Sequence, residues 1–207
     1  MLSLTLVVRL YDAVGVPPRE IVAARHAAAA ALAGAAIDVA WVACAPPARH
    51  VACGDKPRPT DVLVRIVPRS PAPASRSLAD AYVNAADASG ALATVYLERV
   101  RALAAVAGVD PGTLMGRAIA HEIGHLLLGT ATHSRGGLMR AVWSAAQLRR
   151  DHPGVWSFSR PEAARLRARL EARYEAERIE QFAGLVEPLP PTKPGCPGAA
   201  LTCVQRR

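Results

Sequence analysis

The chain has 207 residues, of which 51% are hydrophobic and 20% are charged, so it can bury one sizeable core and does not have the composition of a disordered protein. Its net charge is +8, but aromatic residues make up only 4% and are not interleaved with the basic ones, which argues against a nucleic-acid partner. No uninterrupted apolar run reaches the roughly 18 residues of a membrane span, so none is expected.

Strand and helix patterns alternate in the first third of the chain. Leu4, Leu6 and Val8 fall on one face of a predicted strand, and Pro18 favours a helix start because proline suits the first helical turn. The predicted elements are strands over 2–10, 37–43 and 61–67 and a helix over 18–32. This order predicts a mixed sheet with the helix packed against it.

The segment that follows is less regular. Residues 68–76 are rich in proline and serine and are expected to form a loop, after which Ser77 is a candidate cap for a short helix over 78–84. A fourth strand is predicted over 91–97 and a helix over 98–107 that ends at Gly108. The expected fold class is α+β, with a twisted mixed sheet of about four strands.

A long helix is predicted over residues 111–128. Asp110 and Pro111 are a typical helix start, with a capping acid followed by proline at the first helical position. Gly129 can end the helix in the left-handed conformation. Apolar residues along the helix would fix it against the sheet and make it a rigid support for a site.

Metal-binding chemistry is concentrated on this helix. His121 and His125 are four residues apart, so both imidazoles can point to one metal ion. Glu122 lies about 100° around the helix, beside such an ion, where it can take a proton from a zinc-bound water. A catalytic zinc usually has three protein ligands. His133 is the candidate third ligand, because a turn at Gly129 can bring the chain back toward the metal.

The stretch from 121 to 139 resembles the metzincin metallopeptidases, whose signature is H-E-x-x-H-x-x-G-x-x-H followed by a methionine turn. The resemblance implies that His121, His125 and His133 bind zinc, that Glu122 is the general base and that Met139 is the turn methionine. It also implies a zincin-like fold with an active-site helix, a backing helix and a small helical C-terminal subdomain.

The third histidine region is similar to the matrixin branch in particular, where a serine follows that histidine, as Ser134 does here, and Leu-Met follows shortly after. The spacing departs from the metzincin pattern, because His133 is eight residues after His125 and one extra residue lies on each side of the glycine. Two alternative third ligands are therefore considered: Glu162, as in gluzincin-type peptidases, and the loop residue His152.

The C-terminal part is expected to be helical and then irregular. A short helix is predicted over 140–148 with Trp143 packed inward, and a capped helix over 160–179 begins after Ser159. We expect one catalytic domain over 1–182, with subdomains 1–129 and 130–182. Residues 183–207 are expected to form a proline-rich tail with a cysteine pair.

The four cysteines form two pairs that are close in sequence. Cys44 with Cys53 and Cys196 with Cys203 predict two short disulfide loops and thus an extracytoplasmic or secreted location. An alternative reading of Cys53, which precedes glycine, is a thiolate that blocks the zinc as in matrixin propeptides. The N-terminal residues do not have the pattern of a signal peptide.

The expected function is zinc-dependent endopeptidase activity on peptide or protein substrates. In metzincins an edge strand above the cleft pairs with extended substrate, and the strand over 91–97 or the loop before it is the candidate here. Two alternatives remain: a non-catalytic zinc-binding protein of the same fold, and a gluzincin-like peptidase that uses Glu162.

Overall fold

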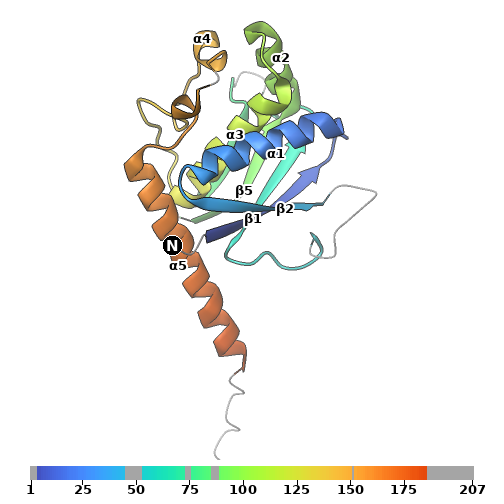
Figure 1. Cartoon of the computed structure of the whole chain (residues 1–207). Helices are drawn as coiled ribbons and strands as arrows, with labels where there is room; N and C mark the ends of the chain where they lie inside the picture. Colours follow the sequence, from blue (N-terminus) through green and yellow to red (C-terminus); the bar gives the residue numbers. More distant parts are fainter. Residues whose placement is uncertain (1–3, 45–52, 73–75, 85–88, 151, 186–207) are drawn as a thin grey trace, which may run out of the picture.

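A mixed five-stranded sheet forms the centre of the protein (Figure 1). The computed structural model describes residues 4–44, 53–72, 76–84, 89–150 and 152–185. The strands are β1 (Leu4–Asp12), β2 (Ile37–Ala43), β3 (Asp61–Val67), β4 (Ala79–Asn84) and β5 (Ser89–Tyr96), in the order β2-β1-β3-β5-β4. All neighbours are parallel except β4, which is antiparallel to β5 and lies at the edge. The α+β class and the mixed sheet are confirmed, with one strand more than predicted.

Two helices cover one face of the sheet (Figure 1). They are α1 (Pro18–Ala33), which connects the parallel strands β1 and β2, and α3 (Pro111–Leu128), which packs on β4 and β5. Alternate residues of β1, Leu6, Val8 and Leu10, are buried in the core. The period of two in the apolar residues therefore decides which sheet face receives the helices.

The remaining helices lie around this layer. They are α2 (Leu97–Ala107), α4 (Ala145–Leu148), the 3-10 turn η2 (Pro153–Val155) and α5 (Arg160–Leu185). Helix α5, orange in Figure 1, runs past the sheet and extends beyond it, and it continues six residues past the predicted end at 179. Among the described residues, no helix is long and apolar enough to cross a membrane.

The prediction of a helix over 78–84 is wrong, because this segment is the edge strand β4. Ala79, Ala81 and Val83 are more buried than the residues between them, and Tyr82 is 75% exposed. This alternation is the pattern of a strand with one buried face. Backbone pairing with β5, from Ala79 opposite Val95 to Asn84 opposite Ser89, overrides the weak local preference for a helix.

The helix predicted over 140–148 is shortened to α4, which has only four residues. Arg140 is held in an extended bridge to Ser134, so the chain cannot enter a helix there. Ser144 then caps α4 through the Gln147 backbone N–H, while the Gln147 side chain accepts a hydrogen bond from the Ser144 N–H. The inward packing of Trp143 is confirmed by its contact with the core.

Helix α3 packs very closely against α1 at two of its glycine residues. A Cβ on Gly116 would lie 2.2 Å from the Ala24 carbonyl oxygen, and one on Gly112 would lie 2.6 Å from that of Glu20. Backbone atoms cannot rotate away as a flexible side chain can. The two glycines therefore set the depth at which α3 sits on α1.

We expect Gly116→Ala to lower the free energy of unfolding by about 1–3 kcal/mol, because the helices must separate to admit one methyl group. Gly136→Ala is the matched control, since the nearest atom to its Cβ is the mobile end of the Arg140 side chain at 3.8 Å. Chemical denaturation of both variants measures the difference. Equal stability of Gly116→Ala and wild type would contradict the close helix crossing.

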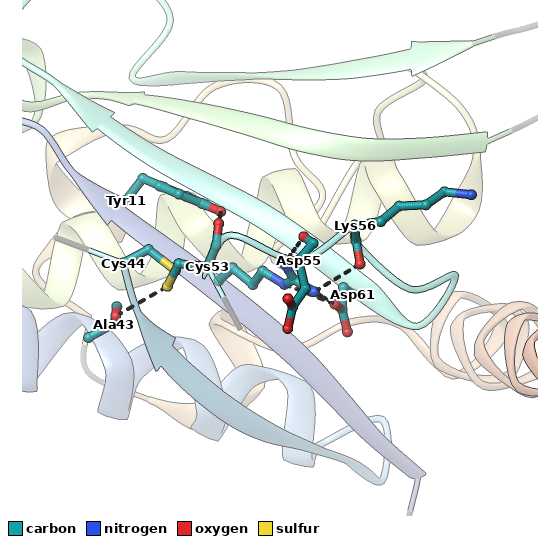
Figure 2. Close-up of a disulfide and its surroundings, with 8 residues drawn as sticks. Tyr11, Ala43, Cys44, Cys53, Asp55, Lys56 and Asp61 are labelled. Atoms are coloured by element: carbon teal, nitrogen blue, oxygen red, sulfur yellow. Dashed lines mark hydrogen bonds and ion pairs between the residues drawn. A yellow bond between two sulfur atoms is a disulfide. The ribbon is translucent and has the colours of Figure 1, made fainter. Parts of the chain in front are cut away.

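A disulfide joins Cys44, after β2, to Cys53, in the segment that leads to β3 (Figure 2). The Cα atoms are 5.6 Å apart, and closing a loop with a sequence separation of 9 contributes about 2–3 kcal/mol by restricting the unfolded chain. Because Cys53 is bonded to Cys44, the interpretation of Cys53 as a thiolate blocking the zinc is wrong. The disulfide is compatible with an extracellular location. Cys196 and Cys203 lie outside the described residues.

Buried polar contacts hold the disulfide segment on the sheet. Arg9, which is 3% exposed, donates from Nε to Asp61 Oδ2 at 2.9 Å and from Nη1 to the Asp55 carbonyl at 2.7 Å. The Tyr11 hydroxyl donates to the Cys53 carbonyl at 3.3 Å (Figure 2). The guanidinium and carboxylate thus satisfy each other in a place where an unpaired charge would be costly.

Candidate metal centre

The site is carried by α3, and the ends of this helix form as the sequence predicts. The Asp110 side chain accepts a hydrogen bond from the Thr113 N–H at 2.6 Å, with Pro111 at the start of the helix. Gly129 ends the helix in the left-handed conformation, with φ of 64°. Nearly every residue between these ends is buried, so the helix is fixed along its length.

Three histidine side chains come together at the end of α3. His121 and His125 are buried on the helix, and His133 is exposed on the loop after it. The Nε2 atom of His125 lies 3.0 Å from that of His121 and 3.3 Å from that of His133. Their potential ligand atoms all lie within 4.8 Å of one another, which makes this a cluster that can hold a metal ion.

The loop closes on the cluster even though it is longer than in the metzincin pattern. The His125 Nδ1 donates to the Thr130 carbonyl at 2.7 Å, which ties the ring to the first residue after Gly129. The Thr130 hydroxyl then accepts from the Thr132 N–H at 3.1 Å, which turns the chain back. The two additional residues are accommodated in this turn, and His133 still reaches the cluster.

The protonation states suit a metal ion. The carbonyls of Leu138 and Thr130 can only accept, so Nδ1 of His121 and of His125 carries the proton and the facing Nε2 atoms present lone pairs. Burial lowers the pKa of His121 to about 4 and also lowers that of His125. Two lone pairs 3.0 Å apart repel each other unless a cation lies between them.

The three imidazole nitrogen atoms and the distances between them also fit a bound metal ion. Three neutral imidazoles suit zinc and several other first-row transition metals. Nitrogen atoms bound tetrahedrally at about 2.0–2.1 Å are roughly 3.3 Å from one another, close to the two Nε2 separations found here. The cluster therefore fits a transition-metal ion.

Glu122 lies next to the cluster but outside it. The side chain is 7% exposed and lines a cavity of about 540 Å³ together with His121 and His133. Burial raises the pKa of Glu122 to about 8, the charge of Asp80 adds to this, and hydrogen bonding from the Ala81 backbone opposes it. A neighbouring cation would favour the carboxylate form. Glu122 thus places a carboxyl group on the wall of the cavity.

Met139 lies beneath the helix that carries the histidines and is 1% exposed. A Cβ on Gly124 would be 2.5 Å from Met139 Sδ and 2.8 Å from a Phe158 ring carbon. Gly124 therefore lets Met139 and Phe158 pack directly against α3 between Glu122 and His125. This role of Gly124 was not predicted, since a glycine inside a helix gives no indication of what approaches it.

Glu162 holds the His133 loop. It is 2% exposed; one carboxylate oxygen accepts from the Ser134 hydroxyl and the other from the Ser159 N–H at 2.7 Å. The Ser134 N–H donates to the Met139 carbonyl at 2.8 Å. Glu162 thus caps α5 and fixes the residue next to His133. Neither Glu162 nor His152 belongs to the cluster of possible ligands among the described residues.

We expect Glu162→Gln to weaken metal binding by about 10- to 100-fold, because the His133 loop loses its charged anchor. Ser134→Ala should weaken it in the same direction, and the double variant should be little worse than Glu162→Gln alone, since both residues act through one contact. Competition with a fluorescent zinc chelator measures the affinities. Unchanged affinity in both single variants would contradict the anchoring role.

Edge-to-face aromatic contacts lie beside the cavity. Trp143 packs edge-on against His121 at 5.5 Å and against Trp156 at 5.2 Å between ring centroids. Arg117 lies 4.0 Å over the Trp156 ring and donates to the Leu148 carbonyl. Trp143 was predicted to pack inward, but its contact with a ligand ring was not.

Comparisons with known proteins identify no family for this chain. No protein-family model matches the sequence, and no curated protein matches it either.

Proposed function

We propose that the protein is a zinc-dependent endopeptidase with a metzincin-like fold. The observation that carries the proposal is the convergence of three imidazole Nε2 atoms beside a buried carboxyl group that faces a cavity. A purely structural zinc site is usually closed by four protein ligands. Here the described residues supply three, and Glu122 stands next to them without joining the cluster.

The edge strand supports a peptide as the substrate. In the described part of the chain, strand β4 pairs with β5 on one side only, and Ala79 at its start lines the cavity next to Glu122. A free strand edge offers backbone N–H and carbonyl groups to an extended peptide. The expectation that the strand over 91–97 would do this is wrong, because β5 is paired with β3 and β4. The loop before it, residues 85–88, lies outside the described residues. The proposal therefore assigns this role to β4.

His121, His125 and His133 would hold the metal, with Nε2 as the ligand atom in each. Bound zinc supplies Lewis-acid chemistry, polarising the scissile carbonyl and lowering the pKa of water toward neutrality. Glu122 accepts a proton from the attacking water on its carboxylate and donates it to the nitrogen of the leaving amine. Trp143 and residues of α3 form walls of the cavity beside these groups.

The two alternatives receive less support. The longer spacing between His125 and His133 would favour a non-catalytic zinc protein with a distorted site, but the loop brings His133 Nε2 to 3.3 Å from His125 Nε2. A gluzincin-like site needs a free Glu162 carboxylate, yet both of its oxygens accept hydrogen bonds from Ser134 and Ser159. The endopeptidase proposal accounts for Glu122 and the cavity together.

Cleavage of a proteome-derived peptide library, read by mass spectrometry, tests the proposal. We expect internal peptide bonds to be cut by zinc-loaded protein, activity to disappear with a zinc chelator, and activity to return when zinc is restored. Stoichiometric zinc without any cleavage would favour the non-catalytic alternative. Cleavage that persists after zinc removal would point to a different site.

A further inference from the structure

Two arginine side chains line the cavity beside Glu122. Arg76 precedes β4, and Arg140 follows Met139 directly. Neither makes an ion pair with any residue in the described part of the chain. Glu122 is the only acidic residue among those that line this cavity. The cavity therefore presents two guanidinium groups to whatever enters it.

Both arginines sit on fixed backbone. The segment that carries Arg76 is tied to α2, because Arg99 donates to the Ser77 carbonyl at 2.9 Å and lies 5.3 Å over the Tyr96 ring. Arg140 is held by its bridge to Ser134. Charged groups on fixed backbone lose less conformational freedom when they bind a partner than groups on a free chain do.

The rest of the cavity is mainly apolar. Its walls include Leu78, Leu103, Val142 and Trp143. A smaller cavity of about 180 Å³ is also lined by Trp143 and Arg140 and adds Arg150. The positive charge thus continues beyond the proposed reaction centre, and a carboxylate is the ligand that guanidinium groups recognise best among ordinary side chains.

We propose that the cleft selects acidic peptides, with Asp or Glu close to the scissile bond, and that Arg76 and Arg140 recognise the acidic side chain. This inference rests on the proposed endopeptidase function. An extended peptide paired with β4 passes Arg76 where the strand begins, and Arg140 lines the same cavity. The two guanidinium groups can then contact acidic side chains while Glu122 stays free for proton transfer.

Pairs of peptides test the inference. Cleaved sequences from the library are resynthesised with Glu or Gln at single positions up to four residues on each side of the cut bond. At the best position, we expect kcat/KM for the Glu peptide to exceed that for the Gln peptide by roughly tenfold. The ratio should fall to about one in the Arg76→Gln/Arg140→Gln double variant and should decrease at high salt.

Arg178→Gln is the matched control, because it removes the same charge from an exposed position on α5 away from the cavity. It should keep the wild-type ratio. Thermal melts check that each variant is folded. A ratio near one in the wild type, or a preference for Glu that survives in the double variant, would overturn the inference while leaving the endopeptidase function intact.

A binding measurement separates the inference from the proposed function. Fluorescence anisotropy with the zinc-loaded Glu122→Gln variant reports the affinity for each labelled, uncleaved peptide. If no peptide is cleaved by wild type, the endopeptidase function fails, and library peptides with matched Glu and Gln forms are used for binding alone. Tighter binding of the Glu form that depends on the two arginines then supports acidic recognition, and equal binding of the two forms overturns it.

Discussion

Glu122→Gln is expected to lower kcat/KM for peptide cleavage by about 10³-fold or more while the protein keeps one zinc ion per chain. The amide has nearly the same shape as the carboxyl group but cannot accept a proton from water, and general acid–base groups typically contribute 10²–10⁴-fold. Zinc should be retained, because Glu122 is not part of the histidine cluster. Elemental analysis and steady-state kinetics on the same preparation measure both effects.

The control for this variant is Glu171→Gln, which removes a carboxylate from an exposed position on α5. It should retain wild-type activity and zinc. Glu122→Ala should lose activity like Glu122→Gln, although it also leaves a space in a buried site. Full activity in either Glu122 variant would show that the proposed mechanism is wrong, and loss of zinc would show that Glu122 is a ligand.

Removal of any one histidine of the cluster is expected to cause a large loss of zinc affinity. His121→Ala, His125→Ala and His133→Ala should each lose the zinc ion or bind it far more weakly, because two imidazoles leave the coordination incomplete. The folded wild type should also lose thermal stability when a chelator removes the metal. A metal ion that binds only the folded protein stabilises the folded state by about 2.7 kcal/mol when its free concentration is 100 times the dissociation constant.

The chain contains its own controls for this experiment. His26 and His152 lie outside the cluster, so His26→Ala and His152→Ala should retain one zinc ion and the wild-type melting temperature with and without chelator. Zinc retained by His133→Ala would move the third ligand elsewhere. A wild type that takes up no zinc from solution would contradict the metal site itself.

Local sequence determined the helix that carries the site. Asp110, Pro111 and Gly129 predicted both of its ends, since each acts on backbone groups within a few residues. The spacing of His121 and His125 fixed their common face for the same reason. The strands over 37–43 and 61–67 were predicted with their observed boundaries, because their apolar patterns were strong and short-range.

Contacts between residues far apart in the sequence decided the rest of the fold and of the site. Strand β4 formed because β5 offered a backbone edge to pair with, which a local cap at Ser77 could not reveal. Glu162 was considered a ligand, and only the position of α5 beside Ser134 gives it an anchoring role.

The same distinction applies to the metal cluster. The sequence by itself brought His121 and His125 to one face and named His133 as their partner. The tertiary structure decided that the longer loop closes, since Glu162, 28 residues further along the chain, accepts a hydrogen bond from the Ser134 hydroxyl and adds to the local hydrogen bonds at Thr130 and Ser134. Backbone preferences act over a few residues, whereas the return of a loop depends on which surfaces the folded chain presents to it.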